Sequence, residues 1–396
     1  MKSICARLLE KGVRMPDPLQ VCIAEDVDLE RIEPGVTLYP GSRISGEETL
    51  LLTGTRIGEE GPATLHNVRT GREVRLKGGF FQDAVFLEKA SAGTGSHVRG
   101  GSILEEGASI AHTVGLKQTI LFPYVTLGSL INFCDIFMAG GTGPKNHSEV
   151  GSSYIHFNFT PDQDKATASM LGDVPSGVML DKAPIFLGGQ GGLVGPCRLA
   201  FGTVIAAGTL QRKDELRENR LLFGSSLKAG NVERKAGLYP GLRRILENNF
   251  FYIANLHALK AWYVFFRSRL ISPFFPESLL QGLVTMVDAG ISERVERLLQ
   301  LREKIRTLDG ASLASSPLHS AWVERAESVC AFLAETEKAE VHAETAVLKD
   351  FFFKDLTFDK TYLGTLALLD EKKREAGRAW LSSVVHTRLA GAWRNL

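Results

Sequence analysis

Histidine is the residue type in this 396-residue chain that best fits general acid–base chemistry, because its unperturbed pKa lies near neutrality. His147 follows a glycine-rich run in the segment TGPKNHSE, so we expect it on a loop that a substrate can reach. We take His147 as the candidate base and Glu149 as the carboxylate that could orient it. Lys145 and Asn146, in the same loop, are candidates for substrate binding.

A second polar set stands in the segment YIHFNF. Strand alternation places Tyr154, His156 and Asn158 on one face and the intervening Ile and Phe side chains on the other. We expect the polar face to form a second wall of a site beside the His147 loop. His156 is then another catalytic candidate, and Tyr154 and Asn158 are candidates for substrate binding. An ordinary outward-facing strand is the alternative.

Composition and charge argue against several classes of protein. The 46 basic and 45 acidic residues give a net charge of +1, so no global field attracts nucleic acid or acidic lipid. The five cysteines form no CxxC pair, which argues against a disulfide framework and a structural zinc site. The most apolar stretch, residues 248–266, is interrupted by Lys260 and is short for a spanning helix. With no apolar signal segment at the start, we expect a cytoplasmic protein without a transmembrane segment.

Large apolar residues recur every six positions in the first half of the chain. The runs are Val98, Leu104, Ile110, Leu116 and Phe122; Leu187, Leu193, Leu199 and Ile205; and Ile32, Leu38 and Ile44. Period six is neither the helical period nor simple strand alternation. It predicts a solenoid of short parallel strands in which three strands make one triangular coil. A β-sandwich with regular turns is the alternative.

The spacing changes near residue 214, which predicts an α+β protein. We expect an N-terminal helix and leading segment in residues 1–26, a β-helix in 27–214 with an insertion at 46–96, and an α-helical domain in 215–396. Steps of three and four residues join Ile291, Val295 and Leu298, as in an amphipathic helix. We expect this domain to cap the open end of the solenoid, with the aromatic run 250–266 as its buried face. A membrane-surface helix is the alternative for that run.

Four stretches resemble the hexapeptide-repeat acyltransferases, and most closely the β-helix domain of bifunctional N-acetylglucosamine-1-phosphate uridylyltransferase/glucosamine-1-phosphate acetyltransferases. They are residues 9–41, Asn132-Phe133, residues 158–165 and residues 185–213, which include the run IAAGT. The resemblance implies a left-handed β-helix, an acyl-CoA co-substrate and a homotrimer with sites between subunits. We see no uridylyltransferase domain in this chain.

The resemblance also implies site residues. Asn132, Asn158 and Lys165 match the sugar-binding stretches, and Lys117 lies near the position where the family holds a sugar phosphate. The residues implied for the acyl-CoA channel are Gly189, Gln190, Gly191, Ala206, Ala207 and Arg212. Phe137 departs from the family's pattern, which has a lysine at that position.

We therefore expect a CoA-dependent acyltransferase, most simply an acetyltransferase, that acts on a sugar, sugar phosphate or nucleotide sugar and needs no metal. One alternative is a non-catalytic sugar-nucleotide-binding or assembly scaffold on the same fold, which Phe137 favours. A nucleotidyltransferase-related protein is a further alternative. A zinc-dependent protein like the γ-carbonic anhydrases would need an H-x4-H spacing, which His147 and His156 do not have.

Overall fold

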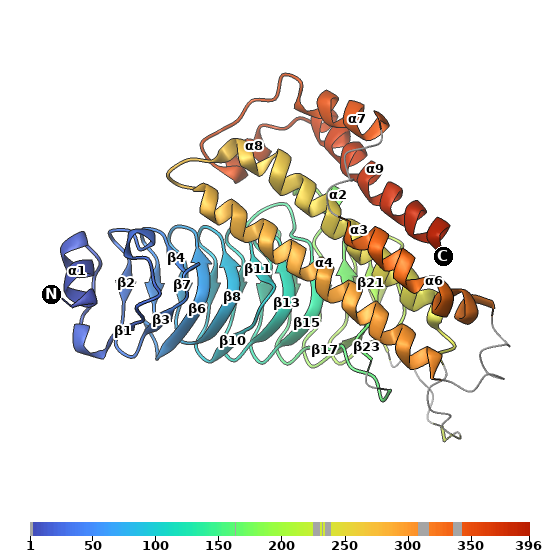
Figure 1. Ribbon diagram of the computed structural model, residues 1–396, viewed down its shortest axis with the longest axis horizontal. Coiled ribbons are helices and arrows are strands. Elements are labelled where there is room, and N and C mark those ends of the chain that lie inside the picture. Colours follow the sequence, from blue (N-terminus) through green and yellow to red (C-terminus); the bar gives the residue numbers. More distant parts are fainter. Residues whose placement is uncertain are drawn as a thin grey trace.

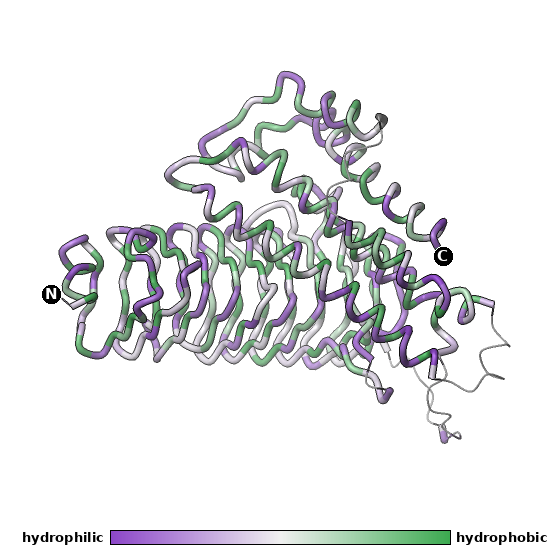
Figure 2. The backbone as a smooth tube through the Cα atoms, viewed as in Figure 1, coloured by the Kyte–Doolittle hydropathy of each residue, from purple (hydrophilic) through white to green (hydrophobic). Residues whose placement is uncertain are grey.

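The computed structural model describes residues 3–162, 164–224, 230–231, 233, 239–307, 317–335 and 343–396. A parallel β-solenoid forms the first half of the chain, and a layer of helices lies along one of its sides (Figure 1). The hydrophobic positions recur from coil to coil along the solenoid, as the six-residue repeat predicts (Figure 2). The prediction of a parallel β-helix followed by an α-helical domain is confirmed, while its left hand stays an implication of the resemblance.

Each coil has three sides, which we call face 1, face 2 and face 3 in chain order. Four strands run without a break from face 1 to face 2, so these faces share one 14-stranded sheet, and face 3 is a separate 10-stranded sheet. The shared sheet contains β1 (Cys22–Ile23), β3 (Arg43–Ser45), β4 (Leu50–Leu51), β6 (Ala63–Thr70), β8 (Gly79–Phe86), β10 (Ser96–Val98), β11 (Ser102–Leu104), β13 (Gly115–Leu121), β15 (Asn132–Met138), β17 (Ile155–Phe157), β18 (Ser169–Leu171), β20 (Gly192–Val194), β21 (Arg198–Leu199) and β23 (Leu210–Gln211). Face 3 contains β2 (Thr37–Leu38), β5 (Arg56–Ile57), β7 (Arg75–Leu76), β9 (Ser91–Ala92), β12 (Ser109–Ile110), β14 (Thr126–Leu127), β16 (Glu149–Val150), β19 (Phe186–Leu187), β22 (Val204–Ile205) and β24 (Leu221–Leu222).

The three edges of the prism are the 1–2, 2–3 and 3–1 corners. At the 1–2 corner Asp83, Gln118 and Asp135 adopt φ angles of 44°, 49° and 59°, so the strand turns there without ending. At the other corners a strand ends and a turn or a longer loop leads to the next strand. The longest excursions are residues 139–148 and 172–185 at the 2–3 corner and residues 158–168 at the 1–2 corner.

Residues 46–96 do not interrupt the solenoid, so the expectation of an insertion there is wrong. Strands β4 to β9 lie in this range and pair in the same two sheets as the rest. Strands β6 and β8 each carry face 1 and face 2 in eight continuous residues. A strand that continues from one face to the next moves the apolar positions out of the six-residue spacing. These coils therefore lack the repeat in the sequence, and this led to the wrong prediction of an insertion.

The helical part contains two long helices that lie along face 2 (Figure 1). The helices are α1 (Ile4–Lys11), α2 (Val174–Gly177), α3 (Leu242–Phe265), α4 (Glu277–Arg306), α6 (Pro317–Ala334), α7 (Ala343–Phe353), α8 (Tyr362–Ala367) and α9 (Glu371–Asn395), with short 3-10 turns at η1 (Pro18–Gln20), η2 (Leu29–Arg31) and η3 (Arg267–Leu270). The expectation that this domain caps the open end is wrong, since Leu221 of the last coil stays 61% exposed. In the described part of the chain, no helix is long and apolar enough to cross a bilayer.

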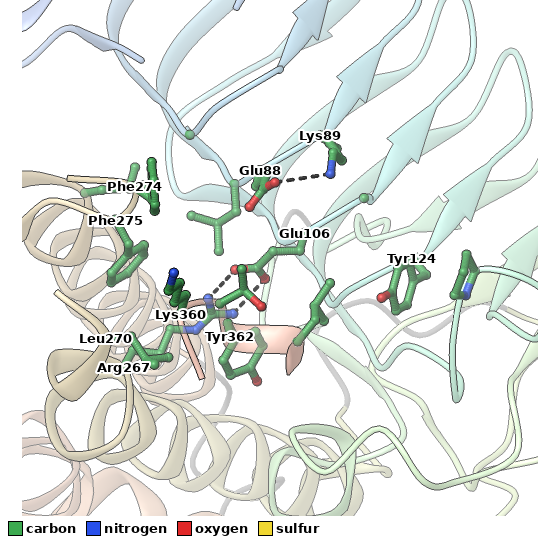
Figure 3. Close-up of a pocket in the computed structure, with 17 residues that line it drawn as sticks. Glu88, Lys89, Glu106, Tyr124, Arg267, Leu270, Phe274, Phe275, Lys360 and Tyr362 are labelled. Atoms are coloured by element: carbon green, nitrogen blue, oxygen red, sulfur yellow. Dashed lines mark hydrogen bonds and ion pairs between the residues drawn. The ribbon is translucent and has the colours of Figure 1, made fainter. Parts of the chain in front are cut away.

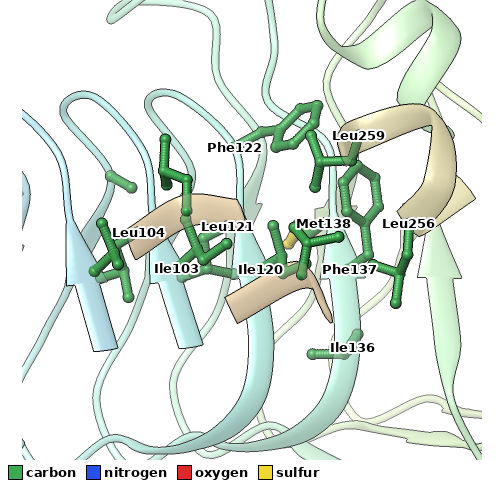
Figure 4. Packing of buried hydrophobic residues seen from close by; sticks show 14 of the residues in the cluster. Ile103, Leu104, Ile120, Leu121, Phe122, Ile136, Phe137, Met138, Leu256 and Leu259 are labelled. Carbon is green, nitrogen blue, oxygen red and sulfur yellow. The ribbon is translucent and has the colours of Figure 1, made fainter. Parts of the chain in front are cut away.

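Face 2 carries an outward row of apolar side chains that the helices bury. Val85, Ile103, Ile120, Phe137 and Met170 occupy successive positions of the strand ladder, and all are buried. Figure 4 shows that the α3 side chains lie beside Phe137, with the labelled pair Leu256 and Leu259 nearest to it. The aromatic run of α3 is buried in the same layer, as predicted.

A buried arginine fastens the helical layer to the 2–3 corner. Arg267 donates from Nη2 to Glu105 Oε2 at 2.8 Å and to Glu106 Oε2 at 2.9 Å. The hydroxyl of Tyr263 donates to Glu105 Oε1 at 2.6 Å. Burial, together with the neighbouring Glu106 carboxylate, raises the pKa of Glu105 to about 7, against the opposing attraction of Arg267.

The first prediction concerns the docking of the helical layer. Arg267→Met should lower the free energy of unfolding by about 3–5 kcal/mol, because it leaves two buried carboxylates without their counter-ion. Arg269→Met, on the exposed side of the same turn, is the matched control and should cost less than about 1 kcal/mol. Urea unfolding followed by tryptophan fluorescence measures both, and equal losses would contradict the role of Arg267.

The second prediction is a pH dependence of stability that depends on Glu105. Its pKa is raised on folding, so between about pH 4.3 and pH 7 the folded chain binds a proton that the unfolded chain does not. The free energy of unfolding should therefore fall as pH rises through this window. Glu105→Gln should remove about 1–3 kcal/mol of that fall between pH 5 and pH 8. Glu88→Gln, at the neighbouring coil, should leave the slope as in the parent protein.

Candidate functional site

A cavity of about 400 Å³ opens at the 1–2 corner, between face 1, the loop 158–168 and helix α4. It brings together five of the residues singled out in the sequence, which are Lys117, Asn132, His156, Asn158 and Lys165. Lys117 and Asn132 stand on adjacent strands of face 1, where Gly115 pairs with Asn132. The corner loop supplies Asn158 and Lys165.

Asp135 and Arg294 hold the loop side of this cavity in place. Both side chains are buried, and Arg294 Nη2 donates to Asp135 Oδ1 at 2.7 Å. The other carboxylate oxygen accepts from Asn158 Nδ2 at 2.9 Å, and Arg294 Nη1 donates to the Lys165 carbonyl at 2.9 Å. Because each partner holds the next, Asn158 and Lys165 are positioned by a buried ion pair rather than by the loop alone.

Sequence reasoning missed Arg294 and Arg99. Arg294 is a charged residue on the apolar side of a helical pattern, three positions after Ile291, and this was the available signal. Arg99 lines the cavity and its Nη2 lies 3.8 Å from Cys134 Sγ. Lys117 pairs with Glu293 of α4 at 3.4 Å. Two further cations therefore accompany Lys165 at this cavity.

His156 is a core histidine at the edge of this cavity. Its Nδ1 donates to the Cys134 carbonyl at 2.5 Å, and its Nε2 lies 2.8 Å from Ser169 Oγ. Burial lowers the pKa of His156 to about 4, so the ring is neutral at pH 7. Both ring nitrogens are engaged, and the expectation of a catalytic role for His156 is not supported by this geometry.

Tyr154 and His156 of the YIHFNF segment point into the prism, while Asn158 follows the end of the strand and lines the cavity. Tyr154 is fully buried beside Phe133, and burial raises its pKa well above the ordinary value, so it cannot contact a substrate as expected. Ile155 and Phe157 point outward and are 41% and 44% exposed. The side chains alternate as predicted. The prediction was wrong about direction, because the Tyr154 and His156 side faces the core of the prism and the Ile155 and Phe157 side faces outward.

The His147 loop lies at the 2–3 corner, away from this cavity. His147 Nδ1 donates to the Pro144 carbonyl at 3.0 Å, which leaves Nε2 with its lone pair and without a hydrogen-bond partner among the described residues. Glu149 points outward on face 3 in β16, so the orienting group is the carbonyl of Pro144 and not Glu149. Lys145 is exposed, and Asn146 donates to Thr142 Oγ1 at 2.8 Å within the loop.

The residues expected to hold acyl-CoA separate into two groups. Gly189, Gln190, Gly191, Ala206 and Ala207 lie at the 3–1 corner of neighbouring coils, between β19 and β20 and between β22 and β23. A Cβ on Gly191 would lie 2.8 Å from the Thr209 carbonyl oxygen, so coil stacking itself requires glycine there. Arg212 follows β23 toward the 1–2 corner, where its carbonyl accepts from Arg244 at 3.0 Å.

Within a single chain, the residues expected to form the site therefore lie at three different corners of the prism. The sugar-binding candidates lie at the 1–2 corner, the His147 loop at the 2–3 corner and the glycine-rich run at the 3–1 corner. Within the described ranges, no group of three or more histidine, cysteine, aspartate or glutamate side chains is arranged to hold a metal ion.

No protein-family model matches the chain. A bifunctional protein GlmU of Pelobacter propionicus is 26% identical over 208 residues, which cover 52% of this chain and 40% of that protein. The GlmU of Thermus thermophilus is 30% identical over 165 residues, which cover 40% and 33% of the two chains. The chain therefore spans about two fifths or less of the length of these curated relatives.

Among solved structures, the polySia-specific acetyltransferase NeuO is 9% identical with a TM-score of 0.20, over 56% of this chain and 82% of that chain. LpxA of Acinetobacter baumannii is 13% identical with a TM-score of 0.19, over 77% and 96%. Scores this low support no inference about this chain. The sequence similarity to the GlmU proteins and the parallel β-solenoid confirm that this chain resembles the hexapeptide-repeat acyltransferase superfamily.

Proposed function

We propose that this protein is a CoA-dependent acyltransferase, most simply an acetyltransferase of the cytoplasm, that acts on a sugar, sugar phosphate or nucleotide sugar. The observation that carries the proposal is the convergence of Lys117, Asn132, Asn158 and Lys165 on one cavity. Lysine and amide side chains suit a ligand that carries an anionic group and hydroxyls.

The cavity offers complementary chemistry to such an acceptor. Arg99, Lys117 and Lys165 supply positive charge for a phosphate, with Glu293 balancing one of them. Phe157 and Phe159, at 44% and 59% exposure, present apolar rings against which a sugar or base can pack. An acyl-CoA co-substrate is proposed to run along the C-terminal coils, past the Gly189–Gly191 corner.

His147 is proposed as the general base. Its Nδ1 proton is held by the Pro144 carbonyl, so Nε2 is the nitrogen that can accept a proton from the acceptor amine or hydroxyl. The acceptor then attacks the thioester carbonyl, the carbon–sulfur bond breaks, and the CoA sulfur leaves with the proton returned by His147. No metal is needed for this sequence of bonds.

A trimer is proposed to bring His147 to the acceptor cavity. Faces 1 and 3 both expose apolar side chains, such as Phe157 on face 1 and Phe186 and Leu221 on face 3. Placing face 3 of one copy beside face 1 of the next, with parallel axes, forms a closed ring. In that ring the His147 loop and the neighbour's cavity lie at the same height on the same side of the interface.

A non-catalytic sugar-nucleotide-binding scaffold is the second candidate. Its support is Phe137, which stands where the resemblance expects a lysine and is fully buried under α3. Calorimetry with acetyl-CoA separates the two candidates, because the scaffold should not bind it.

The third prediction tests the base. The protein should release free thiol from acetyl-CoA when supplied with one of a set of amino-sugar phosphates or nucleotide-linked amino sugars. His147→Ala should lower kcat by about 10²–10⁴ and leave acetyl-CoA affinity nearly unchanged, because the imidazole contacts the acceptor. His112→Ala, an exposed histidine at another corner, is the control. Full activity in His147→Ala would remove the proposed mechanism.

The fourth prediction tests whether the site is shared between copies. His147→Ala and Lys165→Ala should each be inactive alone, and co-expression should restore about a quarter of the parental activity through random assortment within a closed ring. A site built within one copy gives no restoration. Light scattering of the parent protein should report three chains, and a stable monomer would contradict this arrangement.

A further inference from the structure

A second cavity, also of about 400 Å³, lies at the seam between the 2–3 corner and the helical layer (Figure 3). We call it the seam channel. One side is made by solenoid corners, and the other by η3, the connection between α3 and α4, and the start of α8. It is separate from the acceptor cavity, which opens at the 1–2 corner.

The residues that line the seam channel come from a long stretch of the solenoid. Its solenoid side is built from the 2–3 corners of five successive coils, represented by Gly71, Leu87, Gly107, Tyr124 and Pro144. Adjacent coils are about 4.8 Å apart, so these corners span about 19 Å. A cavity of about 400 Å³ drawn out over that length suits a flexible chain better than a fused ring.

The walls of the channel are mostly apolar. Leu270, Phe275, Leu279 and Leu363 line the helical side, and Leu87 lies opposite. Phe274 lines the cavity while it is 49% exposed, with the Arg72 guanidinium 4.4 Å from its ring centroid. An apolar ligand in the channel would remove this surface from water, which is favourable in proportion to the area covered.

One cation on the helical side is available to a ligand. Lys360 lines the channel, is exposed, and forms no ion pair with a described residue. Arg267 also lines it, but its side chain is 1% exposed and is engaged by Glu105 and Glu106, so it is not available to a ligand.

We propose that the seam channel binds a single alkyl chain that ends in a carboxylate, as in a medium- or long-chain fatty acid. The chain lies along the five corners, between their backbone and the leucine and phenylalanine side chains of the helical layer. The carboxylate lies beside the start of α8, where it pairs with Lys360. The proposal does not depend on acyl transfer.

Titration calorimetry with fatty acids of increasing length tests the proposal. Decanoate should bind one per chain, and each methylene added from hexanoate to decanoate should tighten binding about three- to fourfold. Lys360→Gln should weaken the binding of decanoate about two- to fivefold, a small effect because an exposed ion pair contributes little. The affinity for decanol should not change, because decanol carries no charge.

Leu363→Trp should fill the channel and weaken decanoate at least tenfold. Leu368→Trp is the matched control, since Leu368 ends the same helix but is 58% exposed and does not line the channel. Phe274→Asp, in the connection between α3 and α4, tests the same wall without entering a helix. It should weaken decanoate to a similar degree.

Equal decanoate affinity in the parent, Leu363→Trp and Phe274→Asp proteins would overturn the proposal, and so would the absence of decanoate binding. Either result leaves acetyl transfer at the 1–2 corner intact. Decanoate binding that responds to these variants in a protein without transferase activity would uphold the channel and count against the proposed function alone.

Discussion

The apolar outward row on face 2 is the constraint on which the rest of this structure depends. Every strand of a prism turns half of its side chains outward, and on face 2 those side chains are Val, Ile, Phe and Met in five successive coils. Such a stripe is unstable in water, so a second layer must cover it. Helices α3 and α4 supply that layer. Both cavities arise where the edges of this layer meet a corner of the solenoid.

One buried arginine holds each edge of the helical layer. Arg267 meets Glu105 and Glu106 at the 2–3 corner, and Arg294 meets Asp135 at the 1–2 corner. Apolar contacts alone are non-directional and would let the helices slide along face 2. A buried ion pair tolerates little displacement, because separating the charges leaves each of them unpaired in a medium of low polarity. The arginines therefore fix the position of the helical layer along face 2. Arg294 also fixes the position of Asn158, because both side chains bond to Asp135.

The repeat made the solenoid readable in the sequence, since one large apolar residue per side fills the prism in every coil. The continuous strands β6 and β8 were not readable as coils, because a strand that turns a corner without a loop breaks the period. The residues that converge at the 1–2 corner were identifiable in the sequence, while the inward direction of His156 was not. Its strand follows a loop, and a one-residue change of register reverses every side chain. Arg294 could be found only by asking why a charge sits on the apolar side of a helix.

The separation of the expected site over three corners is a consequence of the fold itself. The prism is packed with leucine, isoleucine and phenylalanine side chains, so its corners cannot move toward one another. General-base catalysis requires the base within hydrogen-bond reach of the acceptor or one water away. A rigid solenoid can meet that requirement only if a loop spans a face or if another copy presents its own corner. Face 2 lies between the His147 loop and the acceptor cavity, and α3 and α4 occupy it. Among the described residues, no loop of the same chain crosses face 2 between the two corners, and this is the reason for proposing that a second copy of the chain completes the site.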